Sequence, residues 1–218
     1  MTVLVERDAV ELKTEADHRI ANNLESLNSV VRLQRNAIAQ GAKTYTAAQV
    51  CALLDEFSAR IEVIARLHKL LALATDGIGV NLGDFLREIC EMTGTLGAQG
   101  NVNLTVDNSC DDCIDPRDAL HAGLITAELL TNASKYAHPT GLPVKVKVRC
   151  ETKSDGAFVL EVSDDGVGFP ENFDPATDGG LGFQLMRALA DGLQAELQFE
   201  HDSLGVCARL VKPKDPTS

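Results

Sequence analysis

The sequence predicts an α+β protein with a helical N-terminal domain and a C-terminal α/β sandwich. Two long patterns of apolar residues at alternating four- and three-residue steps fill the first third of the chain, as expected for amphipathic helices. Farther on, alternating apolar and polar segments occur between shorter helical patterns, which favours helices on one face of a mixed sheet. Asp76-Gly77-Ile78-Gly79 interrupts the periodicity between these regions, so we place the domains at residues 1–76 and 77–218.

The first helix is predicted over residues 8–40, with a glycine directly after it. One face of this helix carries the apolar residues Ile20, Leu24, Leu27, Val31 and Ile38. His18 and Asn22 lie one turn apart and point away from that stripe, so both are expected to face solvent. Taken alone, an exposed histidine is most simply a solvated surface residue.

A second helix is predicted to follow Thr46, its N-cap, and to end near Ala74. Its apolar stripe consists of Val50, Leu54, Phe57, Ile61, Ile64 and Leu71. The short connection makes the two helices an antiparallel hairpin. One hairpin cannot cover the apolar stripes of both helices, so we expect a homodimer in which two hairpins form a four-helix bundle.

The second domain is predicted to alternate between helices and strands. Helical patterns cover residues 81–96, 116–137 and 182–193, and strand patterns cover residues 102–106, 144–150, 158–162, 195–199 and 206–210. The turn Ser154-Asp155-Gly156 should join two of these strands into a hairpin. A proline near its start suits the helix over residues 116–137.

Composition excludes several classes of function. The net charge of −12 argues against nucleic-acid binding, which depends on Lys and Arg to neutralise phosphates. No signal-peptide pattern follows Met1, and no apolar run approaches the length of a membrane span, so we expect a cytoplasmic protein without membrane insertion. Cys110-Asp-Asp-Cys113 has the spacing of half a zinc site, but the other four cysteines are isolated. Incidental thiols are therefore favoured over a metal site or a disulfide framework.

The helix over residues 116–137 has a polar face made of Glu128, Asn132 and Lys135. Oxygen donors of this kind hold Mg²⁺, and an ammonium group neutralises phosphate charge. The simpler alternative, when this helix is considered alone, is a solvated face that carries a salt bridge.

Two glycine-containing segments follow. In residues 163–170, Asp164 is placed to accept a hydrogen bond from an exocyclic amine such as that of adenine, and Gly166 and Gly168 allow a sharp turn and a close approach to a flat ligand. Residues 179–182, Gly-Gly-Leu-Gly, open a helix whose N-terminal amides suit a phosphate. The sequence contains no P-loop.

These clusters, in this order, resemble the ATP-binding domain of the Bergerat (GHKL) type, which histidine kinases share with gyrase, the ninety-kilodalton heat-shock chaperones and MutL. The segment Asp17-His-Arg-Ile-x-Asn-Asn-Leu24 narrows the resemblance to bacterial two-component histidine kinases. It is similar to the subgroup related to the HWE kinases, whose phosphoacceptor is followed by arginine. The resemblance covers about residues 8–211, and the Trp-x-Glu element of strict HWE kinases is absent because the chain has no tryptophan.

The resemblance implies a role for each matching residue. His18 is the phosphoacceptor, Asp17 would orient its ring or take its proton, and Asn22 would assist dephosphorylation of a regulator. Asn132 is the Mg²⁺ ligand. Glu128, counted with the catalytic residues, and Lys135 lie beside the phosphates.

Asp164 reads adenine in this scheme. The glycines that flank the nucleotide lid, expected at residues 169–178, are Gly166, Gly168, Gly180 and Gly182.

The function that follows is an ATP- and Mg²⁺-dependent protein-histidine kinase. It would phosphorylate itself on His18 and pass the phosphoryl group to an aspartate in the receiver domain of a response regulator. A separate sensor protein would supply the input, since no sensor domain is attached. The alternatives are a histidine phosphotransfer protein that does not use ATP, and an ATP-gated dimerisation module in which His18 is incidental.

Overall fold

The computed structural model describes residues 79–96, 102–110, 113–138, 142–154 and 157–214, and separate positions between 31 and 69. Internal contacts divide the chain into two units, Met1–Ala72 and Leu73–Ser218. In the first unit every described position is helical except Thr46, whose carbonyl oxygen accepts a hydrogen bond from Val50 N at 3.0 Å, as expected of an N-cap residue. His18, Asp17 and Asn22 lie outside the described residues.

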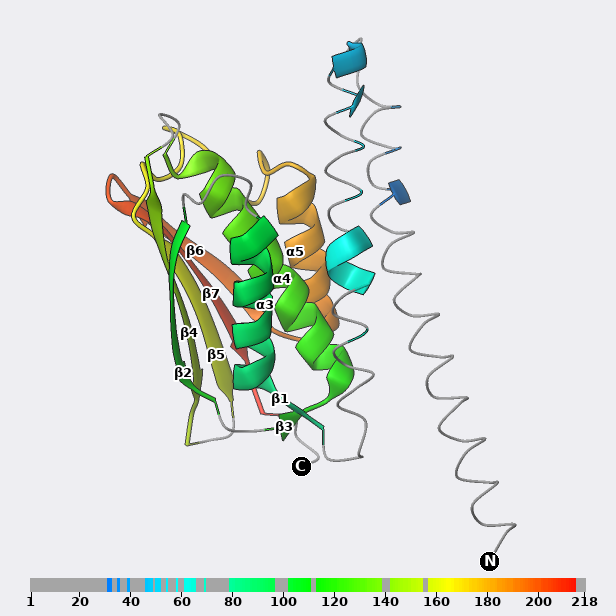
Figure 1. Ribbon diagram of the computed structural model, residues 1–218. Coiled ribbons are helices and arrows are strands. Elements are labelled where there is room, and N and C mark those ends of the chain that lie inside the picture. Colours follow the sequence, from blue (N-terminus) through cyan, green and yellow to red (C-terminus); the bar gives the residue numbers. More distant parts are fainter. Residues whose placement is uncertain are drawn as a thin grey trace, which may run out of the picture. The chain divides into compact units, whose positions relative to one another are not determined.

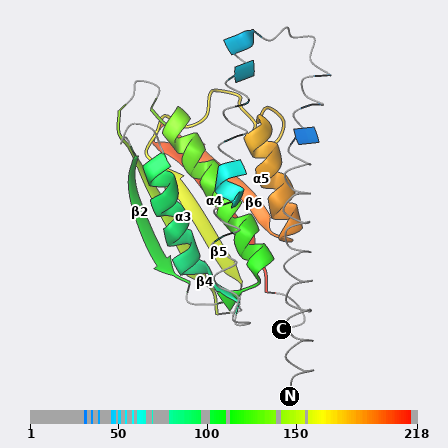
Figure 2. The same cartoon turned by 45° about the vertical axis from the view of Figure 1, so that its right-hand side comes forward.

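The second unit is built on a five-stranded mixed sheet. Its elements are β1 (Val80–Asn81), α3 (Leu82–Leu96), β2 (Val102–Ser109), β3 (Cys113–Ile114), α4 (Pro116–Tyr136), β4 (Val144–Thr152), β5 (Phe158–Asp164), α5 (Leu181–Gly192), β6 (Glu196–Asp202) and β7 (Gly205–Lys212). The strand order is β2-β4-β5-β7-β6, with β2 and β4 parallel and the other neighbours antiparallel. Helices α3, α4 and α5 lie on the same face of the sheet (Figures 1 and 2). The predicted α+β sandwich is confirmed for this unit.

Alternation along β4 shows how the sequence makes one face of the sheet apolar. Val144, Val146 and Val148 are buried, whereas Lys145 and Lys147 between them are exposed. Because successive side chains of a strand point to opposite faces, the valines line the helix-covered side. The helices complete this core with fully buried residues, namely Leu82, Leu86, Ile89, Ile125 and Met186.

Helix α4 is the central helix of the unit, and its start is fixed by local chemistry. The Asp115 side chain accepts a hydrogen bond from Arg117 N at 2.7 Å, and Pro116 occupies the first turn, where a missing N–H costs nothing. Most of the helix is buried as far as Leu130. None of the helices in the described part of the chain has the length and apolar character that a membrane crossing requires.

The cysteines depart from the sequence-based expectation. Cys110 and Cys150, expected to be unrelated, are paired as a disulfide with their Cα atoms 5.6 Å apart. Parallel pairing of β2 with β4 places Asn108 opposite Cys150, which brings the end of β2 to this sulfur. Cys113 is exposed, and within the described ranges no group of three or more His, Cys, Asp or Glu side chains could hold a metal ion.

His121 is a buried titratable group in α4, two turns before the polar face of the same helix. It lies in α4 at 8% exposure, and its Nδ1 atom has no hydrogen-bond partner within the described structure. A Cβ atom on Gly192 would lie 2.9 Å from the His121 ring, so the glycine lets α5 pack closely against it. Burial is the main cause that lowers the pKa of His121. The Arg117 charge lowers it further, and Asp118 partly opposes them.

We expect this histidine to make the unit less stable in mild acid. A folded-state pKa below the ordinary value means that the unfolded chain binds the proton more readily, so stability falls as pH drops below about 6.5. The free energy of unfolding of the wild type, measured with urea, should fall as pH is lowered from about 7.5 to 5.5. His121 should contribute a slope of up to about 1.4 kcal/mol per pH unit. His121→Leu should have a flatter profile. Parallel profiles for the two proteins would contradict the assignment.

Candidate functional site

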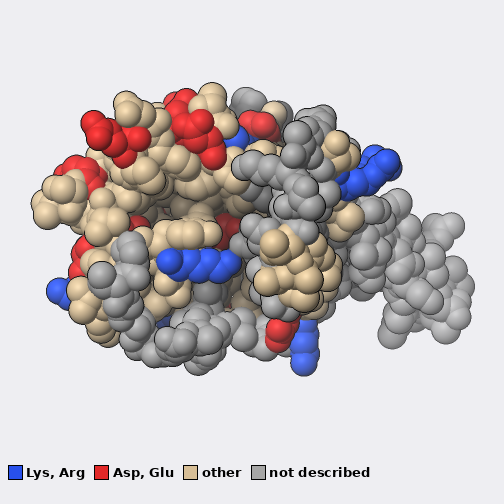
Figure 3. Space-filling model, turned by 90° about the horizontal axis from the view of Figure 1, so that it is seen from above, with Lys and Arg blue, Asp and Glu red and all other residues tan. Residues whose placement is uncertain are grey.

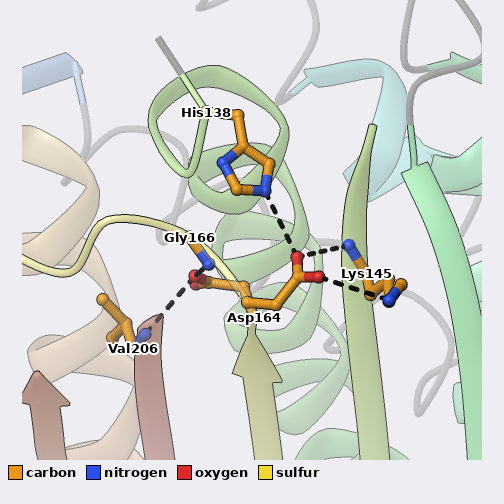
Figure 4. Close-up of polar contacts among 6 residues, drawn as sticks. His138, Lys145, Asp164, Gly166 and Val206 are labelled. Carbon is orange, nitrogen blue, oxygen red and sulfur yellow. Dashed lines mark hydrogen bonds and ion pairs between the residues drawn. The ribbon is translucent and has the colours of Figure 1, made fainter. Parts of the chain in front are cut away.

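Asp164 is the last residue of β5, and two main-chain amides hold one of its carboxylate oxygens. Its Oδ1 atom accepts from Gly166 N at 2.9 Å and from Val206 N at 3.3 Å. No residue in the described ranges donates a hydrogen bond to Oδ2. Figure 4 shows Gly166 and Val206 on one side of Asp164, with His138 and Lys145 on the other. The carboxylate is thus held in one orientation, with its second oxygen left as an acceptor.

The electrostatics of Asp164 reflect its half-buried position. Burial is the largest effect and raises the pKa of this carboxyl above its usual value, and the neighbouring charge of Asp165 acts in the same direction. The amides of Gly166 and Val206 oppose this shift because they stabilise the ionised form. The site therefore favours an uncharged partner that donates a hydrogen bond to Asp164, or a cation, over an anion.

Glycines allow three backbone segments to meet around Asp164. A Cβ atom on Gly166 would lie 2.6 Å from Cα of Ala137, directly after α4. Gly168 has a φ of +73° and faces the carbonyl oxygen of Asp202, and Gly205, with a φ of +136°, faces that of Asp164. Side chains would overlap these backbone atoms. The protein's own packing therefore requires glycine at residues 166 and 168, whether or not a ligand also requires it.

The polar face of α4 runs toward this meeting point. Glu128 is buried at 7% exposure, Asn132 is half-buried, and Lys135 in the last turn is exposed. The end of the helix is tied to the loop after β5 by a 3.0 Å hydrogen bond from Val167 N to the Ala137 carbonyl. The acid, the amide and the amine therefore lie along a helix whose C-terminal end meets the Asp164 loop.

Helix α5 contributes its N-terminus to the candidate site. Gly180 is the N-cap residue and supplies no side chain, so no side-chain hydrogen bond caps the first amides of the helix. Within the described structure no atom lies within 4 Å of the position that a Cβ atom on Gly180 would take. Its φ of −65° suits any residue, so the backbone does not require glycine here. Open space over uncapped amides is what phosphate binding needs. Gly182 follows in the first turn, half-buried.

The segment between β5 and α5, predicted as a lid over residues 169–178, is short and internally bonded. Asp174 accepts hydrogen bonds from Ala176 N at 2.8 Å and from Thr177 Oγ1 at 3.2 Å. Arg187 of α5 donates to the Pro175 carbonyl at 2.7 Å.

A ring cluster that the sequence analysis did not find anchors both ends of this segment. Its members are Phe169, Phe173, Phe183, Phe199 and His201, with neighbouring ring centroids 5.0 to 6.1 Å apart. The sequence did carry one signal for this cluster, because Phe169, Phe173 and Phe183 lie close together in one glycine-rich segment.

This end of the unit is acidic. The segment carries Glu171, Asp174 and Asp178, all exposed. Viewed from above, the molecule shows Asp and Glu side chains along the rim of its visible face (Figure 3). A polyanionic ligand placed here would need positive charge to compensate for them.

The structure thus brings together the end of α4, Asp164 with its two glycines, and the N-terminus of α5. Residues missed in the sequence analysis are Gly205 and Val206, which approach Asp164 from β7, and His138, which follows α4. A main-chain amide from a strand about 40 residues away leaves no local signal, so Val206 could not have been found. The glycine between Leu204 and Val206 did mark a turn.

Two family models match the chain. One, described as histidine kinase, matches residues 15–95. The other, described as histidine kinase-, DNA gyrase B-, and HSP90-like ATPase, matches residues 117–216. The second range contains almost all of α4, together with the Asp164 loop and α5. This part of the chain is therefore a domain of the ATP-binding type.

Relatives with known names agree with these matches. The chain is 29% identical over 204 residues to the blue-light-activated histidine kinase 2 of Erythrobacter litoralis, an alignment that covers 91% of this chain and 56% of that protein. It is 28% identical over 190 residues to the sensor histidine kinase PdtaS of Mycobacterium tuberculosis, covering 85% of this chain and 35% of that protein.

A solved structure of the blue-light activated histidine kinase EL346 from Erythrobacter litoralis matches with a TM-score of 0.73 and 26% identity, covering 92% of this chain and 58% of that chain. The chain spans 35% to 56% of the length of the two relatives above. Two matching family models, together with these relatives, lead to one conclusion: the two regions of the chain are those of a histidine kinase, a histidine-kinase region over residues 15–95 followed by an ATPase domain over residues 117–216.

Proposed function

We propose that this chain binds ATP at the end of the sheet where β5, α4 and α5 meet, and uses it to phosphorylate His18. The observation that carries the proposal is the carboxylate of Asp164, with Oδ1 held by two amides and Oδ2 left as an acceptor. An acceptor fixed in this way matches the exocyclic amine of adenine. It lies at the same end of the unit as the α4 polar face and the uncapped N-terminus of α5.

Phosphate binding is assigned to the α4 and α5 residues. The first amides of α5 at Gly180 and Gly182 would receive phosphate oxygens, and Lys135 would add positive charge. Asn132, half-buried between Glu128 and Lys135, offers an oxygen to Mg²⁺. The bound ion would neutralise phosphate charge. This neutralisation is especially necessary because Glu171, Asp174 and Asp178 make this end of the unit acidic. Gly166 and Gly168 shape the loop that carries Asp164.

The transfer itself needs little covalent chemistry from the ATPase domain. A ring nitrogen of neutral His18 forms a bond to the γ-phosphorus as the bond to the β–γ bridging oxygen breaks, leaving ADP. Asp17 would orient the ring or accept its proton. The phosphoryl group then passes from His18 to an aspartate of a response regulator.

Incubation of the full chain with γ-labelled ATP and Mg²⁺ tests this function. Label that is stable in alkali and lost in acid supports the kinase, because phosphohistidine has that stability. Nucleotide binding without label would select an ATP-gated module. Neither binding nor label would favour a phosphotransfer protein that does not use ATP.

The helical unit is proposed to be an antiparallel hairpin that dimerises into a four-helix bundle, with the domain boundary near residue 76. Support comes from the described positions of its apolar stripes. Val31, Val50, Leu54 and Ile61 are between 43% and 59% exposed in the single chain. Stripes of large apolar side chains of this kind favour burial against a second copy.

We expect the full chain to be a dimer at micromolar concentration and Leu54→Glu to shift it toward monomer, since a charge would be buried at the bundle seam. Light scattering measures both. Ala48→Glu is the matched control, because Ala48 is exposed on the opposite side of the same helix and should leave the dimer intact. A monomeric wild type would contradict the bundle.

Asn22, one turn after His18, is proposed to assist dephosphorylation of the regulator by orienting the attacking water. Asn22→Ala should largely keep autophosphorylation and slow decay of the phosphorylated regulator roughly 10–100-fold, about 1.4–2.7 kcal/mol of barrier. The decay of labelled cognate regulator measures this effect. Asn23→Ala, the neighbouring residue without an assigned role, is the control. Equal decay with Asn22→Ala and wild type would remove the phosphatase role.

A further inference from the structure

Asp165 is the first residue after β5, and its side chain extends the sheet. The last ladder pair of β4 and β5 is Val146 with Asp164, so Asp165 stands opposite Lys145. Asp165 N donates to the Lys145 carbonyl at 3.2 Å, and Lys145 N donates to Asp165 Oδ1 at 2.7 Å. A regular antiparallel pair would use the Asp165 carbonyl for the second bond. The carboxylate thus replaces a main-chain acceptor and frees the backbone to turn.

The same carboxylate also reaches α4. His138, which follows the helix, has its Nε2 atom 3.4 Å from Asp165 Oδ1 and only 19% of its side chain exposed. The Lys145 ammonium is 4.0 Å from Oδ2 with 78% of its side chain exposed. An exposed pair at that distance contributes little, so the Lys145 amide and His138 are the contacts that matter. The Lys145 amide is also the main cause that lowers the pKa of Asp165, with His138 adding to it.

The two adjacent carboxylates are therefore held on opposite sides of one short backbone segment. Asp164 is held by the amides of Gly166 and Val206 (Figure 4), and Asp165 by the Lys145 amide of β4 and by His138 after α4. After them, Gly166 packs against Ala137, which prevents the segment from sliding along the helix. A shift of the backbone at Asp164, which would carry its carboxylate out of place, would require the Asp165 contacts to move as well.

We propose that Asp165, through the Lys145 amide and His138, is a positioning residue that fixes Asp164 for recognition of the 6-amino group of a purine nucleotide. The inference rests on the proposed function, because it assumes that Asp164 receives adenine. Loss of Asp165 would free the backbone at the end of β5 and let the Asp164 carboxylate shift, so the site would no longer separate a 6-amino from a 6-oxo purine. If Asp165 had a purely structural role, its loss would weaken the binding of 6-amino and 6-oxo purine nucleotides to the same degree.

The test is calorimetric titration of the full chain with ADP and with inosine diphosphate, which carries an oxygen in place of the amine. Wild type should prefer ADP. Asp165→Ala should reduce the ADP-to-inosine-diphosphate affinity ratio roughly tenfold, and His138→Ala should reduce it less. Asp165→Asn keeps an oxygen for the Lys145 amide and should restore most of the ratio. Asp107→Ala is the matched control. The Asp107 carboxylate, in β2, pairs with Lys147 of β4, the strand that also carries Lys145, at 3.6 Å on the exposed face of the sheet.

Two outcomes separate the inference from the function on which it rests. A wild type that prefers ADP, with the same ratio in Asp165→Ala, overturns the positioning role and leaves the kinase in place. A wild type that binds neither nucleotide overturns the proposed function and the positioning role together. A restored ratio in Asp165→Asn supports positioning even if Asp165→Ala unfolds at a lower temperature.

Discussion

His18→Ala is expected to abolish uptake of acid-labile label from γ-labelled ATP while nucleotide affinity stays unchanged. The imidazole is the only group on this chain assigned to accept the phosphoryl group, and alanine removes it without touching the ATPase domain. Label is measured on the full chain after denaturing electrophoresis, with acid and alkali washes. Calorimetry with ADP shows that the variant still binds nucleotide.

Asn22→Ala is the matched control for this change. It alters the same helix one turn away and should keep its label, so a general disturbance of the helix would affect both variants. Acid-labile label on His18→Ala would place the phosphoacceptor at another histidine and remove the central assignment.

Asp164→Asn should weaken ADP binding by about 1.5–3 kcal/mol, roughly 10- to 150-fold. The amides of Gly166 and Val206 both donate to Oδ1, so the asparagine must place its carbonyl oxygen there. Its NH₂ group then takes the place of Oδ2 and meets the adenine amine donor to donor. The calorimetric affinity of the full chain for ADP measures the loss.

The pH dependence gives a second check on Asp164. Because burial raises its pKa, the wild-type carboxylate gains its proton at a higher pH than an ordinary aspartate, and ADP affinity should begin to fall there as pH is lowered. Asp164→Asn cannot take up this proton and should lack the decline. Asp107→Asn, which changes a carboxylate on the exposed sheet face, should resemble wild type. Unchanged affinity in Asp164→Asn would remove adenine from this site.

Local periodicity was sufficient to place the helices of the second unit and the strands of its five-stranded sheet. The alternation of Val144, Val146 and Val148 with charged residues located β4, and Pro116 located the start of α4. Strand order did not follow from the sequence, because pairing of β2 with β4 depends on contacts across the whole of α4. The two-residue pair of β1 with β3 is too short to leave a period. Pairing of Cys110 with Cys150 has the same non-local origin.

Contiguous sequence was enough to single out the candidate residues. The structure places Gly166, two residues after Asp164, against Ala137 at the end of α4, and the roles of these residues toward ATP stay predictions. Besides the local Gly166 amide, the contacts that orient Asp164 come from Val206 and, through Asp165, from His138 and Lys145. These contacts exist only after distant strands have paired, and nothing in the local pattern predicts them.

The ring cluster has an entropic consequence for the segment between Phe169 and Phe183. Those two rings lie 5.9 Å apart, so the segment is a closed strap whose ends are already joined before any ligand arrives. Most of the entropy of closing a loop of this length is then lost on folding, not on binding. Binding of the proposed nucleotide would then cost little further ordering of this segment.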